Sequence, residues 1–387
     1  MASLNSVYAN LPVTIFEAVS QLCRETGAIN LGQGFPDDPG PEDVRRKAAE
    51  AVLDGWSQYP PMMGLPALRR AVASHYGRWQ GVALDPETEV MVTSGATEAI
   101  AGALLALIEP GDEVVLLQPL YDAYLPLVLR AGGTPRFVSL KPPHWRLDEH
   151  ALRAAIGPKT KALLFNNPLN PAGAVYGAKD LETLARALEG SDALVVADEV
   201  WEHVTFDGRA HVSALSVEGL AHRTVKIGSA GKIFGMTGWK VGFVCAPPGI
   251  LKILAKAHQF LTFTTPPSLQ EAVAYGLAKE AGWFKAMRDG LQAKRDRFSD
   301  GLRAAGFSPL PSAGTYFLNV DLAPLGVADD LAFCERLIRE AGVAAIPVSS
   351  FYAEDKVTTI ARFCFAKHDS TLDDALARLA AFGGRGG

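Results

Sequence analysis

Short apolar runs that alternate with helical periodicity constrain this fold more than any other feature of the chain. Continuous apolar runs without polar alternation are typical of strands buried on both faces, and helical segments between them can cover those faces. The pattern therefore predicts an α/β fold with a mostly parallel, seven-stranded sheet. The predicted strands are Val90–Thr93, Val114–Leu117, Arg136–Ser139, Ala162–Phe165, Ala193–Ala197, Val225–Gly228 and Val241–Cys245.

The pattern changes after a long helical tract at 267–305, which indicates a second structural unit. Strand-like runs at Thr315–Val320 and Thr359–Phe365 are accompanied there by helical periodicity, as in an α+β unit. We expect two domains, because 387 residues exceed one typical compact domain. Residues 42–285 would form the large α/β domain, and residues 1–41 with 286–387 the smaller one.

The composition favours a globular protein with a small-molecule partner. Apolar residues make up 48%, and 37 basic against 42 acidic residues give a net charge of −5. No basic stretch or membrane-length apolar run stands out, so we expect neither a nucleic-acid nor a membrane partner. The four scattered cysteines indicate buried thiols in a reducing compartment, without a disulfide framework or a metal site. The expected location is cytoplasmic.

Ligands bind at the carboxyl ends of the strands in such a sheet, and several of these ends carry polar residues. Ser94-Gly95-Ala96-Thr97 leads from a strand into a helix, so free N–H groups can face a phosphate there. A simple helix cap is the alternative. Asp198 follows another strand directly, and a buried carboxylate needs either a structural partner or a cationic ligand nitrogen.

The segment Ser229-Ala230-Gly231-Lys232 is the strongest candidate for chemistry. Lys232 follows a buried strand and has small and apolar neighbours in the sequence. Desolvation lowers the pKa of a lysine, and the neutral amine is the form that condenses with an aldehyde. The alternative is a lysine whose ammonium reaches solvent, although the small neighbours leave room for a bound group. Lys240 can flank the same anion.

Two further segments carry polar side chains that either bind a ligand or have a purely structural role. The run NNPLNPAG at 166–173 holds Asn170 in extended or turn geometry at a strand end, because proline restricts the residue before it. Arg362 lies within an apolar strand, where its guanidinium can bind a carboxylate ligand in a bidentate manner. An ordinary turn and an internal salt bridge are the respective alternatives.

Together these segments resemble the class I and II aminotransferases, enzymes of the type I fold that use pyridoxal 5′-phosphate (PLP). The resemblance covers nearly the whole chain and depends on SAGKIFGMTGWKVG, on the DE pair before it and on NNPLNPAG. It is most similar to the branch of kynurenine, glutamine and methionine aminotransferases. The resemblance implies transfer of an amino group from an L-amino acid to a 2-oxo acid, with PLP as cofactor.

The resemblance also implies roles for individual residues around the cofactor. Lys232 is the expected Schiff-base lysine and Asp198 the partner of the pyridine nitrogen, so both are expected catalytic residues. Asn170 is expected to bond the phenolic oxygen and to contact the substrate, and Tyr121 to stack on the ring. The expected phosphate ligands are Gly95, Ala96, Thr97, Ser229 and Lys240.

Further roles concern the substrate and a second subunit. The resemblance implies that Arg362 binds the α-carboxylate of the substrate, that Gly34 in LGQGFPD lies over it, and that Tyr124 contributes to the pocket wall. Tyr59 in SQYPPMMG matches a tyrosine that reaches the cofactor phosphate of the other subunit. A homodimer is therefore expected.

One residue departs from the family pattern. Trp201 follows the DEV sequence where the family usually has a tyrosine that bonds the phenolic oxygen of the cofactor. An indole N–H donates one hydrogen bond but cannot accept one or titrate like a phenol. Trp201 is thus an expected cofactor contact whose hydrogen-bonding role is open.

The substrate class and two rival activities complete these expectations. The stretch HQFLTFTTP lacks the second arginine of aspartate-type enzymes, which favours neutral or aromatic donors such as methionine, glutamine, phenylalanine or kynurenine. A cysteine-conjugate β-lyase shares the fold and most site residues and is the main alternative. A PLP-binding transcription regulator is disfavoured, because about 40 residues before the first helix are too few for a DNA-binding domain.

Overall fold

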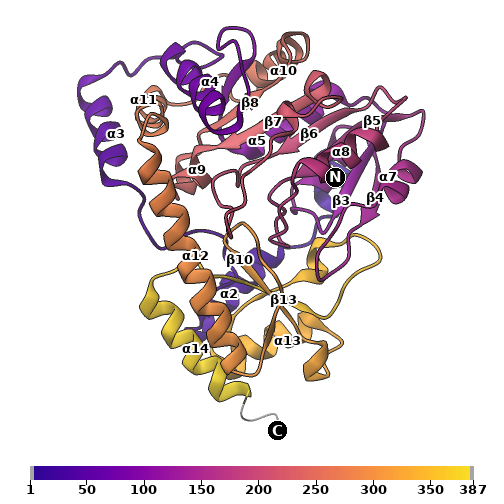
Figure 1. The fold of residues 1–387 in the computed structure, drawn as a ribbon, viewed down its shortest axis with the longest axis vertical. Helices are drawn as coiled ribbons and strands as arrows, with labels where there is room; N and C mark the ends of the chain where they lie inside the picture. The colour runs from indigo at the N-terminus through magenta and orange to yellow at the C-terminus, as the bar shows by residue number, and fades with distance from the viewer. Residues whose placement is uncertain (1–3, 384–387) are drawn as a thin grey trace.

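The computed structural model describes residues 4–383 and contains the predicted seven-stranded sheet (Figure 1). β8 runs antiparallel to its neighbours β2 and β7, and all other adjacent strands are parallel. The prediction of a mostly parallel sheet is confirmed, and every predicted run forms one of its strands. In spatial order these are β2 (Val90–Thr93), β8 (Gly242–Cys245), β7 (Thr224–Ser229), β6 (Leu194–Asp198), β5 (Thr160–Asn166), β3 (Glu113–Gln118) and β4 (Thr134–Ser139).

Helices cover both faces of this sheet. They are α3 (Glu42–Asp54), α4 (Pro66–Gln80), α5 (Gly95–Leu107), α6 (Tyr124–Arg130), α7 (Glu149–Ala155), α8 (Ala178–Ala187), α10 (Pro248–Leu261) and α11 (Pro267–Leu277). In β3, Val114 and Leu116 pack into the cluster that contains α5 and α10, whereas Val115 and Leu117 pack into the cluster that contains α7 and α8. Successive strand residues face opposite sides, so two covered faces require the near-continuous apolar sequence.

Helix ends follow their sequence signals. α4 begins with Pro66 at its first position, where a missing N–H costs no hydrogen bond, and it ends at Gly81. Gly81 adopts a φ of +66°, a left-handed conformation that is cheap for glycine. α3 carries Glu42 and Asp43 in its first turn, where their negative charges interact favourably with the positive end of the helix dipole.

A smaller antiparallel sheet forms the second unit. Its order is β12 (Ile346–Pro347), β13 (Ile360–Cys364), β10 (Phe317–Asp321) and β9 (Ser308–Pro309). The N-terminal strand β1 (Ile29–Asn30) pairs with β11 (Val343–Ala344), which joins the N-terminal segment to this unit. α12 (Ala281–Ala304) extends from one sheet to the other (Figure 1). The predicted boundary at 285 lies within α12, and the division into two domains stays a prediction.

The remaining helices are short or lie around the second unit. They are α1 (Ser6–Ala9), α2 (Ile15–Thr26), α9 (Ala230–Ile233), α13 (Asp330–Arg336), α14 (Asp369–Gly383), the π-helical turn Leu337–Ala341 and the 3₁₀ turns Ala214–Ser216, Ala221–Arg223, Thr237–Trp239, Ala323–Leu325 and Val348–Phe351. Within residues 4–383, no helix combines the length and the apolar character needed to cross a membrane.

A buried ion cluster fixes the segment that follows β6. Lys226 of β7 is fully buried, and its Nζ donates to Glu199 Oε2 at 2.5 Å and to Glu202 Oε2 at 2.9 Å. Burial opposes charge on Glu199, but Lys226 and His211 outweigh this effect and lower the pKa of Glu199 to about 2. Because Glu199 and Glu202 lie on either side of Trp201, the cluster fixes the backbone of that residue.

We expect Lys226→Met to destabilise the protein strongly. The substitution leaves two buried carboxylates without their cation, which costs about 3–5 kcal/mol in comparable cases. Urea denaturation monitored by circular dichroism measures the free energy of unfolding. The control is Lys161→Met on β5 of the same sheet, where the side chain is exposed and the change should stay within about 0.5 kcal/mol. Equal effects of the two substitutions would contradict a structural role for the cluster.

Candidate active site

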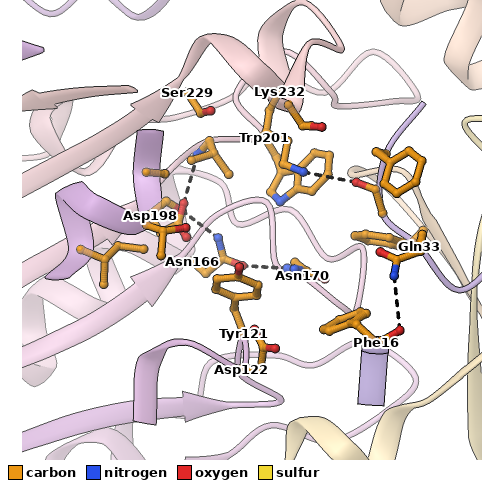
Figure 2. Close-up of a pocket in the computed structure, with 18 of the residues that line it drawn as sticks. Phe16, Gln33, Tyr121, Asp122, Asn166, Asn170, Asp198, Trp201, Ser229 and Lys232 are labelled. Carbon is orange, nitrogen blue, oxygen red and sulfur yellow. Dashed lines mark hydrogen bonds between the residues drawn. The ribbon is translucent and has the colours of Figure 1, made fainter. Parts of the chain in front are cut away.

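A cavity of about 370 Å³ lies at the carboxyl ends of the central strands (Figure 2). Asn166, Asp198 and Ser229 end β5, β6 and β7, and all three line it. The topology therefore brings distant sequence segments to one edge of the sheet, as expected for this architecture. The predicted site residues that line the cavity are Gly34, Ala96, Thr97, Tyr121, Asn170, Asp198, Trp201, Ser229, Lys232 and Arg362.

Lys232 extends into the cavity from α9, the short helix after β7. Its Nζ donates to the carbonyl oxygen of Gly34 at 3.3 Å and lies 4.6 Å from the ring centroid of Trp201. Burial lowers the pKa of Lys232 to about 8, and smaller effects of Cys364 and Asp198 in the opposite direction do not offset it. A substantial fraction of the amine is therefore neutral near physiological pH.

Asp198 forms a buried carboxyl group at the end of β6. Its Oδ2 accepts a 2.6 Å hydrogen bond from the hydroxyl of Tyr124, and its Oδ1 accepts one from the backbone N–H of Val200. Burial raises the pKa of Asp198, while the Tyr124 hydrogen bond acts in the opposite direction. A cation beside this carboxyl would remove the cost of its ionisation.

Tyr124 does not line the cavity, in contrast to the expectation from the sequence. Its side chain is 2% exposed, and its hydroxyl donates to Asp198, which itself lines the cavity. The ring of Tyr121, by contrast, lines the cavity and meets Tyr124 edge-on at 5.6 Å. Tyr124 thus contacts the cavity through Asp198, and its role toward the substrate stays a prediction.

Arg362 is a buried cation on β13. It donates to Asn170 Oδ1 at 3.1 Å and to the Gly32 carbonyl at 2.8 Å, and its guanidinium lies 3.8 Å from the ring centroid of Phe317. Burial lowers its pKa to about 9. Among the described residues, Nε has no hydrogen-bond partner and no carboxylate pairs with the guanidinium. An anionic ligand would compensate this buried charge.

The first turn of α5 lies at one end of the cavity. Gly95 has a φ of +78°, and Ala96 and Thr97 line the cavity directly after it. Lys240 packs against this turn, since a Cβ on Gly95 would lie 3.2 Å from its Cε. Gly95 and Lys240 thus lie beside the cavity and not in its lining. Free backbone N–H groups and a nearby ammonium both favour an anion.

Tyr59 lies outside the cavity of its own chain. Its side chain is 82% exposed, and its ring meets Phe263 edge-on at a centroid distance of 5.4 Å. The cavity of a single chain therefore contains no contribution from Tyr59, unlike most of the other predicted residues.

Several residues of the cavity lining were not among the sequence predictions. Gln33 and Asn166 belong to motifs that the sequence does indicate, next to Gly34 and Asn170. No sequence motif indicated Phe317. The glycine at position 34 is explained by it, because a Cβ on Gly34 would lie 2.6 Å from the Phe317 ring. The additional lining residues are Phe16, Gln33, Phe35, Ile100, Asp122, Asn166, Val200, Thr237 and Phe317.

Curated relatives match almost the full length of the chain. The chain is 44% identical over 378 residues to a probable N-succinyldiaminopimelate aminotransferase, DapC, of Mycobacterium tuberculosis, covering 95% of each. It is 40% identical to the methionine aminotransferase of Escherichia coli, covering 95% of this chain and 96% of the relative. It is 36% identical to kynurenine–oxoglutarate transaminase 1 of Homo sapiens, with 91% and 92% covered.

Solved structures share the fold. The N-succinyldiaminopimelate aminotransferase from Mycobacterium tuberculosis superposes with a TM-score of 0.95 at 44% identity, over 98% of this chain and all of that one. A mutant of the Thermus thermophilus aspartate aminotransferase gives a TM-score of 0.90 at 32% identity, again over 98% of this chain and all of that one. The predicted type I fold is confirmed.

The family and the cofactor follow from these comparisons together with the cavity. The family model described as aminotransferase class I and II matches residues 26–379. Its cofactor is PLP, and the donor set fits this group: Lys232 offers an amine, Asp198 a buried carboxyl and the first turn of α5 an anion site. The resemblance inferred from the sequence is confirmed. This chain belongs to the class I and II aminotransferases.

Proposed function

We propose that this aminotransferase acts on L-amino acids with neutral or aromatic side chains and that Lys232 is its central catalytic residue. The observation that carries the proposal is the position of Lys232, a buried amine in one cavity with Asp198 and Arg362. These three groups supply an amine for the aldehyde, an anion for a cationic ring and a cation for a carboxylate.

The remaining polar groups divide among the parts of the cofactor. We assign Tyr121 to the flat face of the ring and Asn170 to the phenolic oxygen, and Asp198 would keep the ring nitrogen protonated. When bound, PLP supplies an aldehyde and an electron-withdrawing ring that stabilises negative charge at the substrate Cα. The proposed phosphate ligands are Gly95, Ala96, Thr97, Ser229 and Lys240.

Lys232 is the proposed carrier of the proton in the transfer reaction. Its Nζ takes the proton from the substrate Cα as a general base and afterwards donates it as a general acid. Such catalysis typically contributes about 10²–10⁴-fold to the rate, and it is most effective when the pKa lies near the working pH. Burial of Lys232, which lowers its pKa to about 8, supports this role.

Arg362 is the proposed anchor of the substrate α-carboxylate. Its guanidinium is buried without a carboxylate among residues 4–383, and its hydrogen bond to Asn170 joins it to the cofactor side of the cavity. An anchored carboxylate restricts rotation of the substrate, so its Cα–H bond can stay directed at Lys232. Gly34 allows the Phe317 ring to approach the backbone, and its carbonyl accepts the hydrogen bond of Lys232.

Trp201 is a proposed contact of both Lys232 and the cofactor. The face of its indole lies 4.6 Å from Nζ of Lys232, and the ring packs edge-on against Tyr316 at 4.6 Å. The indole favours the charged form of the amine through its π electrons, which opposes the effect of burial. In place of the phenol of the family, this residue therefore offers an aromatic face and an N–H donor.

The lining of the cavity supports the proposed substrate class. Phe16, Phe35 and Phe317 are aromatic, and the lining cations are Arg362 and Lys232, which both have other roles in this proposal. A carboxylate on the substrate side chain would find no further lining cation, and Asp122 would repel it. The relatives named for methionine and for kynurenine have donors of the favoured kind.

A homodimer is the proposed assembly, with Tyr59 reaching the cofactor phosphate of the other subunit. Large apolar side chains are exposed around this residue, including Leu53 at 82%, Trp56 at 72% and Phe260 at 85%. Exposed apolar clusters of this kind mark interaction surfaces. The contact between Tyr59 and Phe263 connects the two segments that carry these side chains.

We also propose a cytoplasmic location. All four cysteines are buried free thiols in the structure, which supports a reducing compartment. Small-molecule substrates and the acidic net charge are consistent with this location.

The capture of PLP by the cofactor-free protein should depend on pH through Lys232. The pKa of Lys232 is about 8 instead of 10.5, so the neutral fraction rises with pH and approaches its limit above about pH 9. We expect the rate of covalent capture, followed by absorbance, to rise and level off accordingly. Borohydride reduction and peptide mapping should place the label on Lys232. A rate that keeps rising to about pH 10.5, or a label on another lysine, would refute the assignment.

Neutral and aromatic donors should be preferred over acidic ones. We expect kcat/KM for methionine, phenylalanine or kynurenine to exceed that for aspartate by at least about tenfold, because a side-chain carboxylate lacks a counter-charge. Both products are measured with 2-oxo acids as acceptors. Incubation with cystathionine, whose sulfur on Cβ can leave, and without a 2-oxo acid detects the pyruvate and ammonia that a β-lyase would form. Equal or better turnover of aspartate would overturn the proposed substrate class.

Hybrid dimers should reveal whether Tyr59 completes the site of the partner subunit. Tyr59→Ala and Lys232→Ala are each expected to lower activity, and a mixed dimer contains one site in which both residues are intact. Mixing the two variants should therefore restore activity. The control mixes Asp198→Asn with Lys232→Ala, which alter the same site and should restore none. Failure of the first mixture, with dimers verified by light scattering, would contradict a shared site.

A further inference from the structure

His258 is buried where three segments of the large unit meet. It lies in the last turn of α10 and is 1% exposed. Its Nδ1 is 3.1 Å from Glu98 Oε1 and 3.2 Å from Glu98 Oε2, and its Nε2 is 3.1 Å from the carbonyl oxygen of Met62. The hydroxyl of Thr262 lies 3.3 Å from Nδ1. The ring thus connects α10 with α5 and with the segment that carries Tyr59.

The partners of this ring indicate its charge. A backbone carbonyl and a carboxylate accept hydrogen bonds, so both ring nitrogens of His258 must donate if both contacts are satisfied. A doubly protonated ring beside an ionised Glu98 satisfies both contacts at once. Glu98 lies in the first turn of α5 and His258 in the last turn of α10, positions where the helix dipoles favour these charges.

Both partners of His258 lead to the proposed phosphate site. Glu98 Oε2 accepts the backbone N–H of Ser94 at 3.0 Å, which holds the start of the turn that contains Gly95, Ala96 and Thr97. Met62 lies three residues after Tyr59, and the carbonyl of the next residue accepts from Val92 N on β2.

The backbone of His258 completes this connection. Its carbonyl oxygen accepts the N–H groups of Thr262 and Phe263, and the ring of Phe263 meets that of Tyr59. Phe263 has a φ of +65°, an unfavourable conformation for a residue with a side chain, so the surrounding contacts must hold it. One buried residue therefore contacts the turn, the Tyr59 segment and the loop that supports Tyr59.

We propose that His258 is a buried imidazolium that acts as a positioning residue. It joins the first turn of α5, which carries proposed phosphate ligands of its own subunit, to the segment around Tyr59, which in this proposal contacts the cofactor phosphate of the other subunit. This inference rests on the proposed phosphate ligands and on the proposed role of Tyr59. The charged pair orients Glu98, Glu98 orients the backbone N–H groups of the turn, and the second ring nitrogen holds Met62. One side chain thereby connects the proposed phosphate ligands of one subunit to the residue that contacts the phosphate in the other.

His258→Phe tests this inference through the phosphate group of the cofactor. The variant keeps an aromatic ring but removes both donors, so the affinity of the full-length protein for PLP should fall by at least about tenfold. Affinity for pyridoxal, which lacks the phosphate, should change less than about twofold. The matched control is His75→Phe in α4, which removes another buried histidine with two hydrogen bonds and should leave both affinities unchanged.

Glu98→Gln provides a second variant in case His258→Phe does not fold. The glutamine amide can donate to Nδ1, so the contacts persist while the charge disappears. ¹⁵N chemical shifts of the histidine ring should indicate an imidazolium in the native protein at neutral pH and a neutral ring in this variant. PLP affinity should fall several-fold, with pyridoxal again unaffected.

The outcomes separate this inference from the proposed function. A neutral His258 in the native protein, an equal loss of PLP and pyridoxal affinity, or no loss in either variant would overturn the positioning role. Transamination and borohydride labelling of the native protein test the role of Lys232 independently. The hybrid dimers test Tyr59 without any change at His258.

Discussion

Burial of Lys232 without a carboxylate in contact is the constraint on which the rest of the site depends. Lys226 lies on β7, the strand that precedes Lys232, and is fully buried, but Glu199 and Glu202 contact its ammonium and raise its pKa despite burial. Lys232 is hydrogen-bonded to the carbonyl of Gly34, and burial lowers its pKa to about 8. Burial acts against the charge of both lysines, and the pKa values shift in opposite directions because only Lys226 has carboxylates in contact.

The sheet makes this difference possible. Parallel strands end at one edge, so Asp198 and Lys232 enter the cavity from neighbouring strand ends while Glu199 turns away toward Lys226. The consecutive residues Asp198 and Glu199 thus direct their carboxylates to different places, Asp198 to the cavity and Glu199 to the buried Lys226. Asp198 accepts a hydrogen bond from the hydroxyl of Tyr124, which fixes the orientation of its carboxyl group at the cavity.

The sequence was sufficient for features that depend on local pattern. The seven strands could be predicted because burial on two faces imposes apolar runs. Lys232, Asp198 and Arg362 could be chosen as candidates for the cavity because polar groups at or within such strands need partners. The position of Tyr124 could not be predicted, since its direction depends on how α6 packs. The aromatic lining, Phe16 and Phe317, comes from the second unit without any motif, because packing between distant segments leaves no periodic signal.

The cavity joins the two units, and its geometry therefore depends on bonds between them. Arg362 and Phe317 come from the small sheet, whereas Lys232 and Asn170 come from the large unit. Arg362 donates to Asn170, Lys232 to the Gly34 carbonyl, and the hydroxyl of Tyr316 to the Lys232 carbonyl at 3.0 Å. A substrate with its carboxylate at Arg362 and its reacting carbon at Lys232 would bind to both units at once. The energy of binding can then hold the two units in the arrangement that the proton transfer requires.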